Sequence, residues 1–159
     1  MPAAPTPAIA ALIRAKVAFT LHPYHHDPAT TAFGDEVVAA LGWEPVRVFK
    51  TLVASVDGTL VVGIVPVAAH LDLKALAAAA GGKKASMAKV ADAERSSGYV
   101  AGGISPLGQR KALPTVIDST AERFETVMVS AGKRGLQVEL APADLIAQCR
   151  AKVADIASE

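Results

Sequence analysis

The sequence has a single cysteine, Cys149, among its 159 residues. With only one thiol, neither an intramolecular disulfide nor a cluster of thiolate metal ligands can form. Leu145, Ile146, Val153 and Ile156 stand at helical spacing from Cys149, which predicts that all five share one face of a C-terminal helix. We therefore expect Cys149 to be a small core residue.

Long apolar runs are also missing. No stretch reaches the length of a membrane-spanning helix, and the N-terminus lacks the charged segment and following apolar segment of a secretory leader. Together with the low cysteine count, these absences predict a soluble protein of the reducing cytoplasm with no membrane partner.

Neither sign of charge is in excess, because 16 Lys and Arg residues face 15 Asp and Glu residues and the formal net charge is +1. No global positive field therefore attracts nucleic acid, and any contact with a polyanion must be local. Three basic pairs could supply such a contact, although solvated surface charge is the simpler interpretation of each. They are Lys83-Lys84, Arg110-Lys111 and Lys133-Arg134.

The motifs of common hydrolases are absent as well. The sequence has no G-x-S-x-G elbow and no H-E-x-x-H helix, and no pair of carboxylates stands out. His22, His25 and His26 occur close together, but without the Cys/His spacing of a metal site. We therefore expect no metal and no other cofactor, and side chains that position a substrate more than they attack it.

Hydrophobic patterning predicts one α+β domain over residues 6–159, after a short tail of residues 1–5. The hydrophobic fraction of 52% supplies an adequate core for it. Because helices and strands do not alternate strictly, we expect a mixed, strongly twisted, barrel-like β-sheet flanked by helices. Predicted helices cover 7–16, 34–41, 70–80, 87–95 and 142–157, and predicted strands cover 19–22, 46–56, 59–66, 99–101, 115–118, 126–130 and 137–140.

Local signals support several of these boundaries. Thr6 before Pro7 predicts a capped helix start, and Asp72 and Ser86 are candidate caps of later helices. Asp57-Gly58 between two apolar runs predicts a two-residue hairpin turn.

Lys50 is the most unusual residue, because it interrupts an apolar strand. An unpaired ammonium group taken out of water costs several kcal/mol, so we expect Lys50 to hold a phosphate or a developing oxyanion. The alternative is a side chain that reaches solvent at a strand end. Thr51 follows directly, and neighbours on a regular strand face opposite ways, so both can enter one pocket only where the strand bulges or ends.

Three further segments are candidates for a binding site. The loop GGISPLGQ (102–109) has glycines that allow close backbone approach to a ligand, although a structural turn explains it equally well. Ser130 ends a predicted strand just before the glycine-flanked pair Lys133-Arg134. Tyr24 lies on a loop beside a strand end, where it could stack on a base or donate its hydroxyl.

Taken together, these segments resemble the YbaK/EbsC family of freestanding aminoacyl-tRNA deacylases, which are related to the editing domain of bacterial prolyl-tRNA synthetase. The likeness extends over nearly the whole chain. It rests on YHHDPATTAFGDEVVAALG (24–42), FKTL (49–52), PVAAHLDLKALA (66–77), RSSGYVAGGISPLGQRKALPTVID (95–118) and VSAGKRGLQVEL (129–140).

The resemblance implies a role for each matching residue. Lys50 would hold the phosphate near the terminal adenosine of tRNA, and Gly102 would offer its backbone beside the scissile carbonyl. Ser130 would lie close to the aminoacyl group. The remaining residues implied in substrate binding are Tyr24, Thr51, Gly103, Ile104, Ser105 and Gln137. Gln137 stands where the family often has an acid, so this chain keeps an acceptor there but loses a charge.

The reaction implied is trans-editing, the hydrolysis of mischarged Cys-tRNA(Pro) in which the cysteine thiol of the substrate attacks its own carbonyl. The implied partners are the aminoacylated 3′ end of tRNA(Pro) and, transiently, prolyl-tRNA synthetase. Three alternatives stay open at this point. The protein could clear Ala-tRNA(Pro) or another mischarged tRNA with an activated water, it could bind tRNA ends without catalysis, or it could be a plain globular domain with Lys50 at its surface.

Overall fold

The computed structural model describes residues 6–159, so the predicted tail of residues 1–5 lies outside the described part. The helices are α1 (Pro7–Arg14), α2 (Phe33–Leu41), α3 (Leu73–Ala79), α4 (Val90–Ser97), α5 (Pro142–Cys149) and the 3₁₀ segment η1 (Ser119–Arg123). The strands are β1 (Thr20–Pro23), β2 (Phe49–Val56), β3 (Thr59–Pro66), β4 (His70–Leu71), β5 (Ala85–Met87), β6 (Thr115–Asp118), β7 (Val127–Lys133), β8 (Leu136–Leu140), β9 (Lys152–Ala154) and β10 (Ala157–Ser158).

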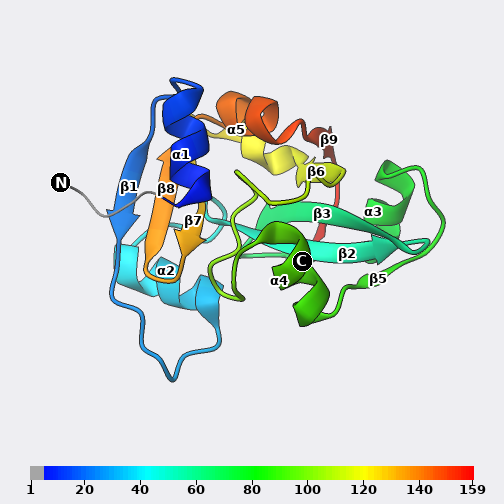
Figure 1. The fold of residues 1–159 in the computed structure, drawn as a ribbon, viewed down its shortest axis with the longest axis horizontal. Coiled ribbons are helices and arrows are strands. Elements are labelled where there is room, and N and C mark those ends of the chain that lie inside the picture. The colour runs from blue at the N-terminus through cyan, green and yellow to red at the C-terminus, as the bar shows by residue number, and fades with distance from the viewer. Residues whose placement is uncertain (1–5) are drawn as a thin grey trace.

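Two sheets form the frame of the molecule. A five-stranded mixed sheet has the order β5-β2-β3-β6-β9, and a three-stranded antiparallel sheet has the order β1-β8-β7 (Figure 1). Strands β3, β6 and β9 run parallel, whereas β2 is antiparallel to both of its neighbours. A parallel bridge between Val48 and Met128 joins the two sheets.

This arrangement confirms the predicted single α+β domain with a mixed, twisted sheet. The expected closure into a barrel is not found, because the strands of residues 6–159 form separate sheets, with β4 and β10 as a further pair. A single bridge between the two larger sheets is too little pairing to make one continuous wall.

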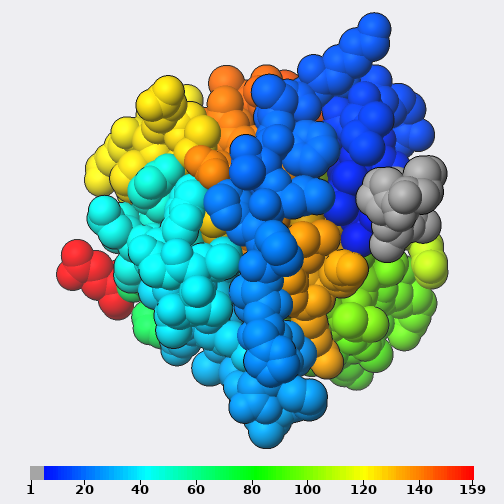
Figure 2. Space-filling view, turned by 90° about the vertical axis from the view of Figure 1, so that its left-hand side faces the viewer, coloured from blue at the N-terminus to red at the C-terminus, as the bar shows by residue number. Residues whose placement is uncertain are grey.

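The largest apolar core lies between the two main sheets and the helices α1 and α5. Leu12, Ile64, Ile117, Val129 and Leu145 are among its buried side chains. A smaller cluster under α2 contains Val37, Val48 and Met128, so it fills the junction where the two sheets meet. Figure 2 shows β1 and the loop after it running across this side of the molecule, between α2 and the β7–β8 hairpin. Among residues 6–159, no helix has the length and apolar character that crossing a membrane requires.

Several predicted local signals are confirmed. Thr6 Oγ1 accepts a hydrogen bond from the amide of Ile9 at 3.2 Å, and Asp72 Oδ1 accepts one from Ala75 at 3.0 Å. The Asp57-Gly58 turn closes the β2–β3 hairpin, with Gly58 at φ +87°.

The predicted C-terminal helix of residues 142–157 is too long, because α5 ends at Cys149. Arg150 adopts a left-handed conformation with φ 52°, and the chain then pairs with β6 as β9. Val153 and Ile156 therefore do not share a helical face with Cys149. Cys149 still packs against the main core, and its thiol donates a hydrogen bond to the carbonyl of Pro106 at 3.3 Å.

Other boundaries also differ from prediction. Met87 belongs to β5, which pairs with β2, so the fourth helix begins at Val90 and Lys89 replaces the expected cap Ser86. Residues 70–71 form the short strand β4 before α3. The expected strand 99–101 is a loop that pairs with no strand of residues 6–159, and in it the Tyr99 hydroxyl donates to the carbonyl of Leu107 at 2.7 Å. Strand β2 begins at Phe49 instead of residue 46.

Asp118 fastens the C-terminal strands to the sheet. Its side chain lies at the end of β6 with 3% of its surface exposed. Oδ1 accepts from the amides of Ile156 and Ala157, each at 3.0 Å, while Oδ2 accepts from the Thr120 amide at 3.2 Å and the Thr120 hydroxyl at 2.6 Å. One carboxylate thus satisfies four donors.

We expect Asp118→Ala to lower the free energy of unfolding by about 2–3 kcal/mol, because buried amides lose a charged acceptor. Urea unfolding followed by the fluorescence of Trp43, the only tryptophan, measures this change. Asp92→Ala is the control, since the ion pair of Asp92 with Arg95 is solvent-exposed. Equal stabilities of the two variants would contradict the role given to Asp118.

Candidate functional site

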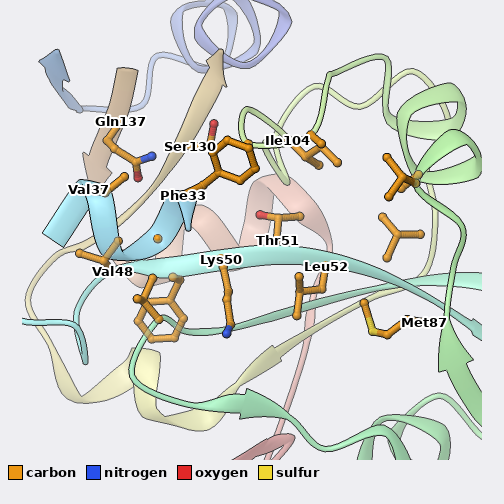
Figure 3. A pocket seen from close by; sticks show the side chains of 18 of the residues that line it. Phe33, Val37, Val48, Lys50, Thr51, Leu52, Met87, Ile104, Ser130 and Gln137 are labelled. Carbon is orange, nitrogen blue, oxygen red and sulfur yellow. The ribbon is translucent and has the colours of Figure 1, made fainter. Parts of the chain in front are cut away.

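A cavity of about 320 Å³ opens between β2, α2, the loop GGISPLGQ of residues 102–109 (the glycine loop) and the β7–β8 hairpin (Figure 3). Its volume is in the range of small-molecule sites. Its lining residues are Phe33, Gly34, Val37, Val48, Phe49, Lys50, Thr51, Leu52, Val53, Val67, Met87, Ala88, Val90, Ala93, Ala101, Gly102, Ile104, Ser130 and Gln137. Most of these are apolar, and Lys50 is the one charged residue that residues 6–159 contribute to the lining.

The structure brings six of the nine predicted site residues to this cavity, although they come from three separate segments of the chain. These six are Lys50, Thr51, Gly102, Ile104, Ser130 and Gln137. The gathering is a property of the fold, since β2, the glycine loop and the β7–β8 hairpin are far apart in sequence.

Lys50 and Thr51 point to opposite faces of β2, as the alternation of a strand predicts. The register of β2 with β3 runs without a bulge from Phe49 to Val56. Figure 3 shows Lys50 and Leu52 on one side of the strand and Thr51 on the other. Both Lys50 and Thr51 nevertheless line the cavity, because no strand of residues 6–159 covers this edge of β2 between its bridge to β7 and its pairing with β5.

The Lys50 side chain is partly buried. Loss of water around the ammonium group lowers the pKa of Lys50, and the negative charge of Asp35 opposes that shift. The amine is therefore held at the wall of the cavity as its local positive charge, where it can attract an anion.

Two polar atoms of the lining are buried without a partner. Thr51 Oγ1 and Gln137 Oε1 have no hydrogen-bond partner among residues 6–159. Buried polar atoms in proteins are nearly always paired, so these two oxygens, on residues that line the cavity, are acceptors left unused within residues 6–159. A rotation of either side chain toward the cavity would let its oxygen accept a hydrogen bond from a ligand. Gln137 stands directly opposite Ser130 in the β7–β8 ladder, which brings both side chains to the same part of the cavity (Figure 3).

Gly102 is placed where a side chain has no room. Its φ is +85°, and a Cβ there would lie 2.6 Å from the ring of Phe33. Arg134 contacts both Phe33 and the chain just before Gly102. Its guanidinium lies 5.1 Å from the centre of the Phe33 ring, and its Nε donates to the Ala101 carbonyl at 2.7 Å. The sequence pointed to Lys133-Arg134 as a basic pair, and the structure adds that Arg134 holds the glycine loop in position.

The other three predicted site residues do not line the cavity. Tyr24 packs beside the cluster under α2, and its amide donates to the Gly135 carbonyl at 2.9 Å. Gly103 is buried. Ser105 is 0% exposed, and its Oγ accepts from the Leu107 amide at 3.2 Å. Their contact with a substrate stays a prediction.

Sequence reasoning missed the apolar part of the lining. Phe33, the first residue of α2, packs over Gly102, and Met87 and Val90 come from segments with no motif of their own. Val67 lies in the family-like segment 66–77, but no site role was predicted for it. Apolar side chains that border a pocket carry the same pattern as those that fill a core, so no sequence signal distinguishes them.

Two of the three histidines of β1 and the loop after it, His22 and His26, form pairs with carboxylates. His22 Nε2 lies 2.8 Å from Glu139 Oε1, and His26 Nδ1 lies 2.7 Å from Glu36 Oε1. The bond to His26 is the main cause of the lowered pKa of Glu36. Within the described part of the chain, no three His, Cys, Asp or Glu side chains come together as metal ligands.

We expect Gly102→Ala to be more destabilising than Gly58→Ala. Both glycines have nearly the same positive φ, but the added methyl at Gly58 meets nothing within 4 Å whereas that at Gly102 overlaps Phe33. The left-handed conformation alone costs about 1–2 kcal/mol in each variant, and the overlap adds roughly 1–3 kcal/mol. Urea unfolding of both variants tests this, and equal losses would mean that Phe33 does not pack on Gly102.

Known proteins resemble this chain in sequence. The model of the family described as "Aminoacyl-tRNA editing domain" matches residues 26–147. The Enterococcus faecalis protein named "Putative Cys-tRNA(Pro)/Cys-tRNA(Cys) deacylase EbsC" is 41% identical over 126 residues, which are 79% of this chain and 77% of that protein.

Two solved structures share the fold. One, described as a "putative trans-editing enzyme for prolyl tRNA synthetase", has a TM-score of 0.83 at 24% identity, with 96% of each chain covered. The other, described as a "hypothetical protein", has a TM-score of 0.85 at 21% identity and covers 96% of this chain and 99% of its own. The extensive family match and the 41% identical relative confirm the YbaK/EbsC resemblance, and the chain belongs to the aminoacyl-tRNA editing domain family.

Proposed function

We propose that this protein is a trans-editing deacylase that removes cysteine from mischarged Cys-tRNA(Pro). The observation that carries the proposal is the composition of the cavity. Residues 6–159 give it one cation, several polar atoms and a glycine loop, but no side chain that is equipped to attack an ester. Family membership and the name of the E. faecalis relative support the same substrate class.

A nucleophile from the protein finds no support in the cavity. Ser130 has the right kind of hydroxyl, but the lining that residues 6–159 form has no His, Asp or Glu to take its proton. The Ser130 Oγ instead accepts a hydrogen bond from the Gly132 amide at 3.2 Å. The one thiol, Cys149, lies outside the lining, and its burial raises the pKa of the thiol to about 12.

The nucleophile is therefore assigned to the substrate. The thiol of the esterified cysteine adds to its own carbonyl carbon, so a carbon–sulfur bond forms while the bond to the ribose oxygen breaks. The thiol proton ends on that ribose oxygen, the tRNA leaves, and water opens the resulting thiolactone to free cysteine. The protein contributes orientation, which makes an intramolecular attack efficient.

Each polar group of the cavity has a place in this scheme. Lys50 holds a phosphate near the terminal adenosine, and Gly102 brings backbone groups close to the ester. Thr51, Ser130 and Gln137 surround the aminoacyl group, and their hydroxyl and amide groups can both donate and accept. Because proline has no thiol, correctly charged Pro-tRNA(Pro) survives even if it enters the cavity. Size exclusion alone would discriminate poorly, since one methylene is worth only about 1–3 kcal/mol.

The partner is the aminoacylated 3′ end of tRNA(Pro). A net charge of +1 suits a protein that binds only this end in a small cavity with a local cation. A transient complex with prolyl-tRNA synthetase would deliver the mischarged tRNA. Support for this partner comes from the structural neighbour that is described as a putative trans-editing enzyme for the same synthetase.

The test of the reaction is a deacylation assay with Cys-, Ala-, Ser- and Pro-tRNA(Pro). Because the thiol acts as an intramolecular nucleophile, we expect Cys-tRNA(Pro) to react roughly 100-fold faster than Ala-tRNA(Pro). Equal rates for cysteine and alanine would replace the thiol mechanism with an activated water. Binding of the tRNA without hydrolysis of any substrate would make the protein a tRNA-end binding module.

We expect replacement of Lys50 to change activity and stability in opposite directions. We expect Lys50→Met to lower kcat/KM for Cys-tRNA(Pro) by about 100-fold, as for loss of an electrostatic contact in an active site. The same variant should unfold at a higher urea concentration near neutral pH. Burial lowers the pKa of Lys50 in the folded state, so the charge opposes folding at every pH below that lowered value and ceases to do so above the unfolded value.

Lys84→Met is the matched control, since Lys84 is exposed and lies beside Asp57, at the turn of the β2–β3 hairpin. It should change neither activity nor stability. Full activity of Lys50→Met would contradict the site and favour an incidental lysine.

A further inference from the structure

Strand β2 has an uncovered edge inside the cavity. On one side β3 pairs with it continuously, from Phe49 to Val56. On the other side β5 pairs only with Ala54–Val56, and β7 makes only the bridge at Val48. Among residues 6–159, no strand pairs with β2 on that side between these two contacts.

Backbone hydrogen bonds fix which residues face the uncovered edge. Val48 faces β3, because its carbonyl accepts from the Val67 amide at 2.7 Å. Arg47 and Val53 face the other way, because their carbonyls accept from the amides of Met128 and Ala88, each at 3.0 Å. Backbone N–H and C=O groups of successive residues in an antiparallel strand point alternately to its two edges. In β2, those of the odd-numbered residues therefore point away from β3, toward the uncovered edge.

Thr51 is therefore the residue whose amide N–H and carbonyl both face the uncovered edge at its centre. Two residues away on either side, the edge is approached by other chain segments, the β7 bridge next to Phe49 and the Ala88 amide at Val53. The edge at Thr51 borders the cavity, and every residue from Phe49 to Val53 lines it.

An aminoacyl ester carries the two groups that complete such an edge. Its α-amine is a donor and its carbonyl oxygen is an acceptor on neighbouring atoms, as in a single residue of a strand. A pair of residues in an antiparallel ladder exchanges two hydrogen bonds of this kind. Backbone pairing of an extended ligand with a free strand edge is a known mode of recognition.

We propose that the aminoacyl group of the substrate binds as a one-residue strand against Thr51. The Thr51 amide donates to the carbonyl oxygen of the ester, and the Thr51 carbonyl accepts from the α-amine. This inference rests on the proposed function, to which it adds the way in which the amino acid is held. It also gives a reason for the backbone edge that β2 leaves uncovered beside the cavity.

The pairing decides where the side chain of the substrate goes. Directly opposite residues of an antiparallel pair send their side chains to the same face of the sheet. The cysteine side chain would then lie on the Thr51 side of β2, next to the buried Thr51 Oγ1, which has no partner among residues 6–159. Figure 3 shows Ser130 and Ile104 on that side and Lys50 on the opposite one. Lys50 is thereby left free for a part of the substrate other than the amino acid side chain.

Amide hydrogen exchange measured by NMR tests the pairing. The probe is cysteine joined by an amide to the 3′-amino group of 3′-amino-3′-deoxyadenosine, which keeps the α-amine and the carbonyl but cannot be hydrolysed as an ester. At saturation we expect exchange of the Thr51 amide to slow roughly tenfold or more. The amides of Lys50 and Leu52 face β3 and serve as internal controls, with smaller changes. The nucleoside without an acyl group should leave Thr51 unprotected.

Bound probe with unchanged exchange at Thr51 overturns the proposal, and so does failure of the probe to bind at millimolar concentration. Deacylation of Cys-tRNA(Pro) is measured in parallel on the same protein. Deacylation without protection of the Thr51 amide would contradict the strand pairing but leave the proposed deacylase function standing. Protection of that amide without deacylation would support the pairing and contradict the deacylase function.

The side-chain placement has its own test. Thr51→Val keeps the backbone edge but removes Oγ1, so it should retain protection of residue 51 while changing the ratio of affinities for the cysteinyl and alanyl probes. An unchanged ratio would place the substrate side chain elsewhere and contradict this geometry.

Discussion

Strand β2 has partners along the whole of one edge and, within residues 6–159, only near the two ends of the other. Most features of the site depend on this gap. It lets a cavity form beside the strand, and it exposes both faces of β2 to that cavity. Neighbouring residues whose side chains point to opposite faces of the strand can therefore line one site. A bulge or the end of the strand was the expected way to bring Lys50 and Thr51 into one pocket, and a missing neighbouring strand achieves the same with regular strand geometry.

The gap is maintained by the elements around it. The bridge between Val48 and Met128 holds the two sheets together at one end, and the cluster under α2 fills the space behind that bridge. On the opposite wall, Arg134 and Phe33 hold the glycine loop, which can approach closely because Gly102 has no side chain. The cavity is thus bordered by packed elements, and two of its lining residues on strands, Thr51 and Gln137, carry buried oxygen atoms without partners among residues 6–159.

The chemistry of the cavity is that of a binding site with one charge. The partly buried ammonium group of Lys50 costs folding stability, and the family relationship gives a reason for keeping it, because a tRNA end brings phosphate. The lining that residues 6–159 form contributes no nucleophile with a base beside it, and the only thiol, that of Cys149, is partly buried outside the lining. A substrate that carries its own nucleophile is a suitable partner for such a cavity, since the protein then needs only to orient it.

Much of the fold could be predicted from the sequence, because its signals are local. The Asp57-Gly58 hairpin, the caps Thr6 and Asp72, the α+β class and Lys50 as an anomaly all follow from neighbouring residues. The family, too, was recognisable from short motifs. Long-range pairing decided the rest: residues 85–87 and 152–154 became strands because β2 and β6 offered them free edges, where local patterns favoured other structure. The cavity and the uncovered edge at Thr51 have the same origin. Sequence patterns report what each strand is suited to pair with, but only the tertiary arrangement determines where a partner is missing.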